Sequence, residues 1–402
     1  MNTTKKIYFQ LLLSTILFVG IVSQAILGWF YLNTTGRFGD LLYVLEKTDC
    51  LDQGKVSLYS ARTQDPCSGY IYGSTLLKFL NLLEINVAKI EFVGFLLIAL
   101  FCLIFIKSIF SAKISNKTSI FFLALFFSPP IILLLERGNI DILILPLISV
   151  AGYCFSRNKI TLGSFAIILA GTFKFYPIFL AIVAIFLLAR GWKKIFLLII
   201  CFLAALIIFN DIIRLPFLPW DARNMFGNII WGEYLAYAIH GAYSHGGYLT
   251  STFLGIFVLF AIFLITMKIT KNKFNKLQVC ADPNRSDLYN FGLYSGVYLT
   301  CYFSGLNVDY RLVFLLMAAI YFEKIFIITP VEKFIYSTIL TFSFFLSYNS
   351  NLFQPIGDLA QLFVVVTLLA SLQVLFKLKI ERFFNKLLVV RDTILASISR
   401  KS

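Results

Sequence analysis

A short polar segment between two apolar runs contains the residue types best suited to chemistry in this chain. Its sequence is Glu-Arg-Gly-Asn-Ile-Asp, residues 136–141, between the apolar runs 120–135 and 142–155. A guanidinium group can bind an anion through two parallel hydrogen bonds, and a carboxylate can accept a proton from a hydroxyl group. Charges at bilayer depth cost roughly 2.5–3.5 kcal/mol each, so they usually face a partner, a cavity or the surface. The candidate binding residues of this segment are Glu136, Arg137, Asn139 and Asp141.

The composition indicates that the elements positioning this segment are membrane helices. Of the 402 residues, 59% are hydrophobic and only 14% are charged, whereas about 25% of the residues of a soluble domain are charged. Continuous apolar runs of spanning length recur along the chain, and they differ from the alternating pattern of barrel strands. We therefore predict an all-α polytopic membrane protein whose single transmembrane domain comprises residues 1–402.

The apolar runs predict about twelve transmembrane helices. Lys174 and Pro177 interrupt one long apolar stretch, which we interpret as two short spans rather than as one kinked helix. This interpretation places 24 of the 35 lysines and arginines on one side of the membrane, as the positive-inside rule expects for the cytoplasm. The expected spans are 7–31, 88–106, 119–135, 140–156, 160–173, 175–189, 195–213, 249–267, 289–304, 311–329, 334–348 and 357–376.

This topology places both chain ends in the cytoplasm, with residues 377–402 as a basic tail. The net charge of +15 is then a signal of topology and of attraction to anionic lipid, and it does not indicate a nucleic-acid partner. The run 7–31 is longer than the apolar region of a typical signal peptide, so we interpret it as a retained span. We expect a multi-pass protein of the plasma membrane, the inner membrane in a bacterium.

The loops on the non-cytoplasmic side collect the polar residues. Two of them are long, residues 32–86 and 214–249, and the first includes a candidate interfacial helix at 75–83. Cys50 and Cys67 share the first loop and could pair if it faces an oxidising compartment, a question that the sequence leaves open. No cysteine or histidine spacing indicates a zinc site. Clustered aspartates could bind a metal, but no ligand spacing requires one, so we assign no metal site and no other cofactor.

Three short motifs resemble a family of membrane enzymes. Asp40 follows the first span and precedes Gly54 and Tyr59, the segment 136–141 comes later, and a Lys-x-Tyr-Pro motif occupies residues 174–177. This pattern resembles the GT-C glycosyltransferases, specifically the polyprenol-phosphate-dependent, mannosyltransferase-like group of glycosyltransferase family 87. The family often has Tyr-Pro-Pro where this chain has Tyr-Gly-Ser at residues 72–74, a departure that bears on the acceptor pocket and on the sugar transferred.

The resemblance implies transfer of a hexose or pentose on the non-cytoplasmic face. The donor would be a sugar on a polyprenyl phosphate, reached from the membrane lipid, and the acceptor would be a hydroxyl of a glycolipid or cell-envelope glycan. Such a reaction needs a base for the acceptor hydroxyl and cationic groups for the phosphate that leaves. An acid of the first loop would be the base, with Asp40 as our first choice and Asp49 as our second.

Cationic and aromatic residues of the other outer loops complete the expected site. Arg137, Lys174 and Arg311 are the candidates for the phosphate, although each has a simpler interpretation as a local ion pair or as a lysine that reaches the membrane interface. Aromatic faces suit sugar rings, and an imidazole can bond to phosphate or sugar. The other substrate-binding candidates are Tyr176, His240, His245 and Asp309.

Two other functions fit parts of the same pattern. A transporter or glycolipid flippase would use the broken stretch at residues 174–177 and the charges near the ends of spans. Its polar residues, however, would be expected at mid-span, and the two halves of this chain do not repeat each other. A polysaccharide polymerase or ligase would be expected to have more arginines in its outer loops.

Overall fold

The computed structural model is mostly helical, and helices account for 85% of the residues that it describes. It describes residues 37–55, 74–111, 114–174, 176–180, 278–280, 283–303, 311–346 and 356–376, the pairs 225–226 and 307–308, and the single residues 15, 67, 199 and 203. The predicted all-α class is therefore confirmed for the described part of the chain. The two histidine candidates, Asp309, most of the loop 214–249 and the tail 377–402 lie outside it.

From α3 onward the described helices follow one another along the chain with short connections up to residue 174. In chain order they are α2 (Gly39–Asp52), α3 (Ser74–Leu82), the 3-10 helix η1 (Val87–Lys89), α4 (Ile90–Ser111), α5 (Asn116–Phe126), α6 (Pro129–Glu136), α7 (Asp141–Ser156), α8 (Ile160–Phe173), the 3-10 helix η2 (Tyr176–Phe179), α13 (Arg285–Phe303), α14 (Leu312–Ile325), α15 (Pro330–Phe345) and the helix Ile356–Phe376.

Two antiparallel pairs of very short strands supplement these helices. Strand β1 (Met225–Phe226) pairs with β3 (Asn307–Val308), and β2 (Gln278–Val279) pairs with β4 (Phe326–Ile327). The first pair ties residues 307–308, just before α14, to a segment more than eighty residues earlier in the chain. The second pair lies at the opposite end of α14.

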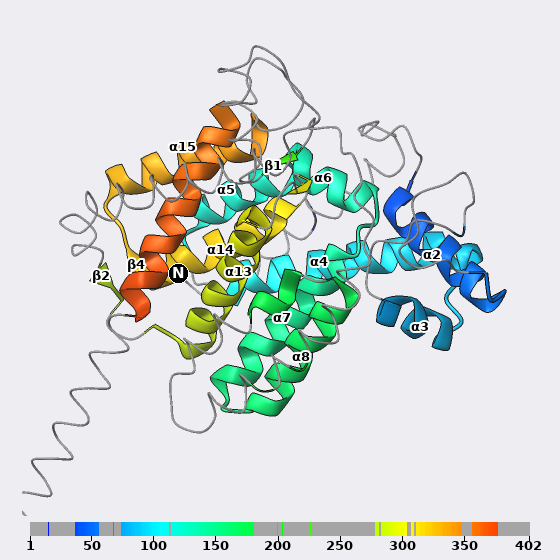
Figure 1. Ribbon diagram of the computed structural model, residues 1–402. Coiled ribbons are helices and arrows are strands. Elements are labelled where there is room, and N and C mark those ends of the chain that lie inside the picture. The colour runs from blue at the N-terminus through cyan, green and yellow to red at the C-terminus, as the bar shows by residue number, and fades with distance from the viewer. Residues whose placement is uncertain are drawn as a thin grey trace, which may run out of the picture.

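Helix α14 forms the centre of the bundle. Its residues from Leu312 to Phe322 are all buried. In Figure 1, α13 and α14, in yellow, lie between the cyan helices α5 and α6 and the green helices α7 and α8. The blue helices α2 and α3 lie together at one end, where α2 meets α4 and α3 meets α8. A helix that is apolar on all sides needs such enclosure, and here the neighbouring helices supply it.

Helices α7 and α13 approach each other closely at Gly152. A Cβ atom added at this glycine would lie 1.9 Å from the Asn290 side-chain oxygen and 3.4 Å from the Asn290 backbone nitrogen. Nearby, the Tyr294 hydroxyl donates a hydrogen bond to the Leu145 carbonyl at 3.1 Å and bonds to the Ser149 hydroxyl at 2.5 Å. The contact between these two helices therefore depends on the absence of a side chain at residue 152.

Two described helices, Val87–Phe110 and Ile356–Phe376, are long and apolar enough to cross a membrane. The expected span 119–135 is instead two helices, α5 and α6, bent by 56° where Ser128 is followed by two prolines. Proline removes a backbone donor and restricts the preceding residue, which explains a break at this position. Helices α7 and α8 are apolar but shorter. The number of about twelve spans stays a prediction, because several of them lie outside the described residues.

Replacing Gly152 with leucine is expected to destabilise the fold. Overpacking a dense interior typically costs about 1–3 kcal/mol, and the new side chain would have to displace Asn290 from α13. We expect the Gly152→Leu variant to melt several degrees below the parent protein in detergent, as measured by intrinsic fluorescence. The matched change Val150→Leu, at an exposed position of the same helix, should leave the melting temperature unchanged. Equal melting of both variants would contradict this interpretation of the α7–α13 contact.

Candidate functional site

The N-terminus of α2 is joined to the polar segment 136–141 through backbone hydrogen bonds. The Phe38 amide donates to the Glu136 carbonyl at 2.7 Å, and the Asp40 amide donates to the Arg137 carbonyl at 3.0 Å. The first amides of a helix have no partners within the helix, so these carbonyls satisfy them. The segment thereby fixes both the position and the direction of α2.

Gly138 makes this close approach possible. Its φ is +58°, in the left-handed region that favours glycine. An added Cβ atom would also lie 3.0 Å from the Phe38 ring and 3.2 Å from the Leu41 side chain. The glycine of the Glu-Arg-Gly-Asn motif therefore has a backbone role, and the residues on either side of it supply the functional groups.

Asp40 is held by two side chains of this segment. Its Oδ1 atom lies 2.7 Å from the Arg137 Nε and 2.5 Å from the Arg137 Nη2, while its Oδ2 accepts a hydrogen bond from the Asn139 amide nitrogen. Asp40 is 7% exposed, whereas 33% of the Arg137 side chain is exposed. The two carboxylate oxygens therefore differ, because one faces a partly exposed cation and the other a buried amide.

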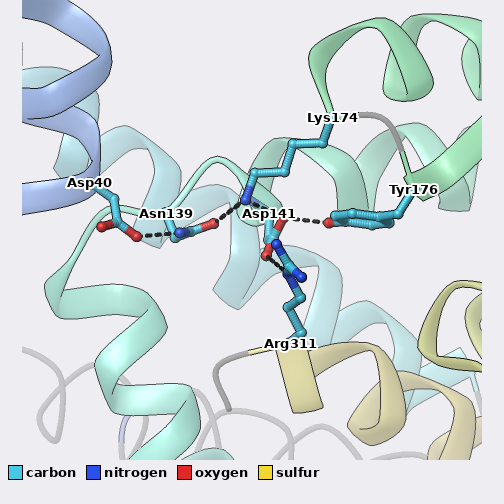
Figure 2. Close-up of polar contacts among 6 residues, drawn as sticks. All are labelled: Asp40, Asn139, Asp141, Lys174, Tyr176 and Arg311. Carbon is cyan, nitrogen blue, oxygen red and sulfur yellow. Dashed lines mark hydrogen bonds and ion pairs between the residues drawn. The ribbon is translucent and has the colours of Figure 1, made fainter. Parts of the chain in front are cut away.

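Asp141 is the centre of a second cluster and is fully buried. Its Oδ1 lies 2.7 Å from the Lys174 ammonium and also accepts a hydrogen bond from the Tyr176 hydroxyl. Its Oδ2 lies 3.7 Å from the Arg311 Nε, and the Arg311 guanidinium lies over the Tyr176 ring at 5.1 Å from the centroid. Figure 2 shows these side chains converging on Asp141, with Lys174 and Tyr176 coming from the junction of α8 and η2 and Arg311 from the start of α14.

Asn139 joins the two clusters. Its side-chain oxygen accepts hydrogen bonds from the Lys174 ammonium at 2.8 Å and from the Asp141 backbone amide at 2.9 Å, while its nitrogen donates to Asp40. The result is one continuous polar network, and Figure 2 shows all of its side chains except Arg137. It contains two carboxylates and three cationic side chains, so their formal charges (+3 and −2) leave a net charge of +1.

Helix ends bring these residues together. Asp141 is the first residue of α7, Lys174 is the C-cap of α8, and Arg311 is the N-cap of α14. Asp40 lies in the first turn of α2. An acidic side chain at a helix N-terminus is stabilised by the partial positive charge there. The break after α8, where Tyr176 and Pro177 begin η2, places the Lys174 side chain in the interior.

The structure joins seven residues in this network, and the sequence singled out all seven as site candidates. They are the proposed base Asp40 and the substrate-binding candidates Arg137, Asn139, Asp141, Lys174, Tyr176 and Arg311. Asp49 is not part of this network in the structure. It lies nine residues after Asp40 on α2, which corresponds to the opposite face of a helix with 3.6 residues per turn. Glu136 contributes its backbone carbonyl to the anchoring of α2.

Phe38 is a positioning residue that the sequence did not indicate. It adopts the left-handed conformation as the N-cap of α2, with φ of +57°. Its ring lies 2.6 Å from where a Cβ atom at Gly94 would be, and it packs edge-on against Phe95. Sequence spacing gives no signal for this contact, because it joins two helices more than fifty residues apart.

A disulfide closes the other end of α2. Cys50, in the last turn of the helix, is bonded to Cys67, with a Cα–Cα distance of 5.6 Å. The pairing that the sequence left open is therefore present in the structure. Helix α2 is thus held at its first turn by the polar segment and near its last turn by a covalent link. Among the described residues, no group of three or more His, Cys, Asp or Glu side chains could hold a metal ion.

Comparison with known proteins agrees with the resemblance drawn from the motifs. The family model of glycosyltransferase family 87 matches residues 71–274, just over half of the chain. The chain belongs to this family, and the protein is accordingly a glycosyltransferase. The matched range includes the segment 136–141 and residues 174–177, whereas Asp40 and Arg311 lie on either side of it. No curated protein and no solved structure matches the chain.

Loss of the disulfide is expected to lower activity through the position of α2. In the Cys67→Ser variant the C-terminal end of α2 loses its covalent tether, while Asp40 keeps its direct partners. We expect reduced glycosyl transfer and a lower melting temperature, since removing a native disulfide typically costs about 2–5 kcal/mol in small secreted domains. Cys280→Ser, at a free cysteine, is the matched control. Full activity and unchanged melting of Cys67→Ser would contradict the role of this link.

Proposed function

We propose that the protein transfers a sugar from a polyprenyl-phosphate donor to a hydroxyl of a lipid-linked or cell-envelope glycan on the non-cytoplasmic face of the membrane. The observation that carries this proposal is the single network in which a candidate base, Asp40, lies beside Arg137 and is connected to two further cations. A lipid phosphate that leaves with negative charge needs such cations, and an acceptor hydroxyl needs such a carboxylate.

The exposure of the three cationic side chains indicates two different roles, one in binding the donor and one in neutralising a buried carboxylate. The side chains of Arg137 and Arg311 are 33% and 19% exposed, whereas that of Lys174 is 3% exposed and pairs with a fully buried carboxylate. We assign the two arginines to the donor phosphate, because a guanidinium can form two parallel bonds with phosphate oxygens. Lys174 neutralises Asp141 and contributes to the positive field, and Tyr176 supports the Arg311 guanidinium through its ring.

Asp40 would act in a single displacement step. Its carboxylate takes the proton of the acceptor hydroxyl as the acceptor oxygen bonds to the anomeric carbon of the donor sugar. The bond from that carbon to the phosphate oxygen breaks, and the polyprenyl phosphate leaves with its electron pair. In the structure the Asp40 Oδ1 is bonded to Arg137. Movement of Arg137 toward the donor phosphate would therefore free this oxygen for the acceptor hydroxyl.

Two independent features support the non-cytoplasmic side. The distribution of lysines and arginines assigns the first loop to that side, and the Cys50–Cys67 disulfide in the same loop is typical of an oxidising compartment. Family membership supports transfer chemistry over a transporter or flippase. The lipid tail of the donor would reach the site from the bilayer, which is consistent with apolar helices of spanning length.

Replacing Asp40 with asparagine is expected to abolish transfer while leaving the protein in the membrane. General-base catalysis contributes about 10²–10⁴-fold to rate, so kcat should fall by at least 100-fold. The assay is transfer of labelled sugar from a panel of polyprenyl-phosphate sugars into total membrane lipid. Glu84→Gln, an exposed acid in the same loop, is the matched control. Full activity of Asp40→Asn together with loss of activity in Asp49→Asn would move the base role to Asp49.

Replacing Arg137 with alanine is expected to weaken binding of the donor. A hydrogen bond to a charged group contributes about 1.5–3 kcal/mol, which is roughly a 10- to 150-fold change in affinity. Competition by polyprenyl phosphate in the transfer assay measures this change. Arg157→Ala, at an exposed arginine that lies over the Tyr153 ring, should bind as the parent protein does. Equal inhibition of all three proteins by polyprenyl phosphate would contradict the assignment of Arg137.

A further inference from the structure

Asn139 occupies a position from which it can control the proposed base. It is completely buried, and its amide bonds to three partners: Asp40 through the nitrogen, and the Lys174 ammonium and the Asp141 backbone amide through the oxygen. These partners come from α2, from the residue that caps α8 and from the start of α7. A side chain with no exposed surface is poorly placed to bind sugar, so its effect on the reaction must pass through its neighbours.

The chemistry of these partners permits only one orientation of the amide. An ammonium group and a backbone N–H can only donate, so the oxygen of Asn139 must face them. An ionised carboxylate can only accept, so the nitrogen must face Asp40. Reversing the amide would place its NH₂ group against two donors and its oxygen against the carboxylate. The orientation therefore follows from the network itself, without any need to distinguish oxygen from nitrogen directly.

We propose that Asn139 is a positioning residue that holds one oxygen of Asp40 and leaves the other for the acceptor hydroxyl. Asn139 bonds to Oδ2, while both contacts from Arg137 go to Oδ1. When Arg137 moves to the donor phosphate, Oδ1 becomes available and Oδ2 stays fixed by the amide. The amide in turn is fixed by Lys174 and Asp141, so the base and the buried cation are aligned by one side chain. This inference rests on the proposed role of Asp40 as the base.

The variant Asn139→Asp tests this proposal, because it changes one half of the amide and preserves the other. The new carboxylate has nearly the same shape and can still accept from Lys174 and from the Asp141 amide, but it offers an acceptor where Asp40 needs a donor. Two adjacent carboxylates repel each other, and such a pair holds a proton up to a higher pH than a single acid does. The acid limb of the kcat/KM profile should therefore move to higher pH, by about one unit or more.

The Asn139→Asp variant should also lower kcat, and a matched variant at an exposed asparagine provides the control. At neutral pH we expect kcat to fall by roughly 10- to 100-fold, less than for Asp40→Asn, because the base is misplaced and partly protonated rather than removed. Asn158→Asp makes the same chemical change at an exposed position between α7 and α8. Its pH profile and its kcat should match those of the parent protein. The assay is transfer from a polyprenyl-phosphate sugar that the parent protein uses.

The exchanged pair Asp40→Asn with Asn139→Asp separates positioning from base catalysis. In this double variant the amide and the carboxylate trade places, so the hydrogen bond between residues 40 and 139 can form again in the reverse direction. The double variant should therefore melt at a higher temperature than Asn139→Asp alone. It should nevertheless remain as inactive as Asp40→Asn, because the carboxylate now lies at the buried position.

The outcomes distinguish a failure of this inference from a failure of the proposed function. Full activity of Asp40→Asn would overturn the base assignment and with it the role of Asn139. Loss of activity in Asp40→Asn, combined with an unshifted acid limb in Asn139→Asp, would overturn the positioning role alone. If the exchanged pair melted no higher than Asn139→Asp, the direct bond between residues 40 and 139 would be refuted. The expected pattern is a shifted acid limb, recovered melting and no recovered activity.

Discussion

The buried carboxylate of Asp141 is the constraint on which the arrangement of the site depends. A charge in an apolar interior is strongly disfavoured unless it is paired and hydrogen-bonded. Asp141 is fully buried, and Lys174, Tyr176 and Arg311 all converge on it. These partners come from the end of α8, from η2 and from the start of α14. Satisfying one carboxylate therefore brings three helix ends to one place, and α7 contributes the fourth.

The second half of the site is built on this frame. Asn139 lies two residues before Asp141 and bonds to its backbone amide, so the polar segment is fixed relative to α7. The same segment supplies the carbonyls that accept from the first amides of α2, and it supplies the two side chains that hold Asp40. Because Gly138 permits the close contact with Phe38, the position of the proposed base follows from the buried ion pairs, although Asp40 is about one hundred residues away in the chain.

Much of the site could be predicted from the sequence, because charged residues are so rare in this chain. The segment 136–141, Lys174 and Arg311 are conspicuous among apolar runs, and the predicted topology places them on one side of the membrane. Their pairing was not predictable, since contacts such as Arg137 with Asp40 join residues far apart in sequence. Neither were the left-handed Phe38 or the bend between α5 and α6, which depend on packing. The sequence named Cys50 and Cys67 as a possible pair, but whether they bond depends on the redox environment. The number of spans stays a prediction from hydropathy and charge.

The two clusters of the network differ in what substitutions can reveal about them. Removing one partner of a fully buried ion pair leaves an uncompensated charge, at a cost of about 3–5 kcal/mol, so loss of activity at Lys174 or Asp141 would not distinguish folding from chemistry. Arg137 and Asp40 form a pair whose cation is one-third exposed. When one partner is replaced, water can therefore hydrate the charge of the other. The reaction is therefore best examined through this partly exposed pair, while the buried cluster around Asp141 determines where the pair lies.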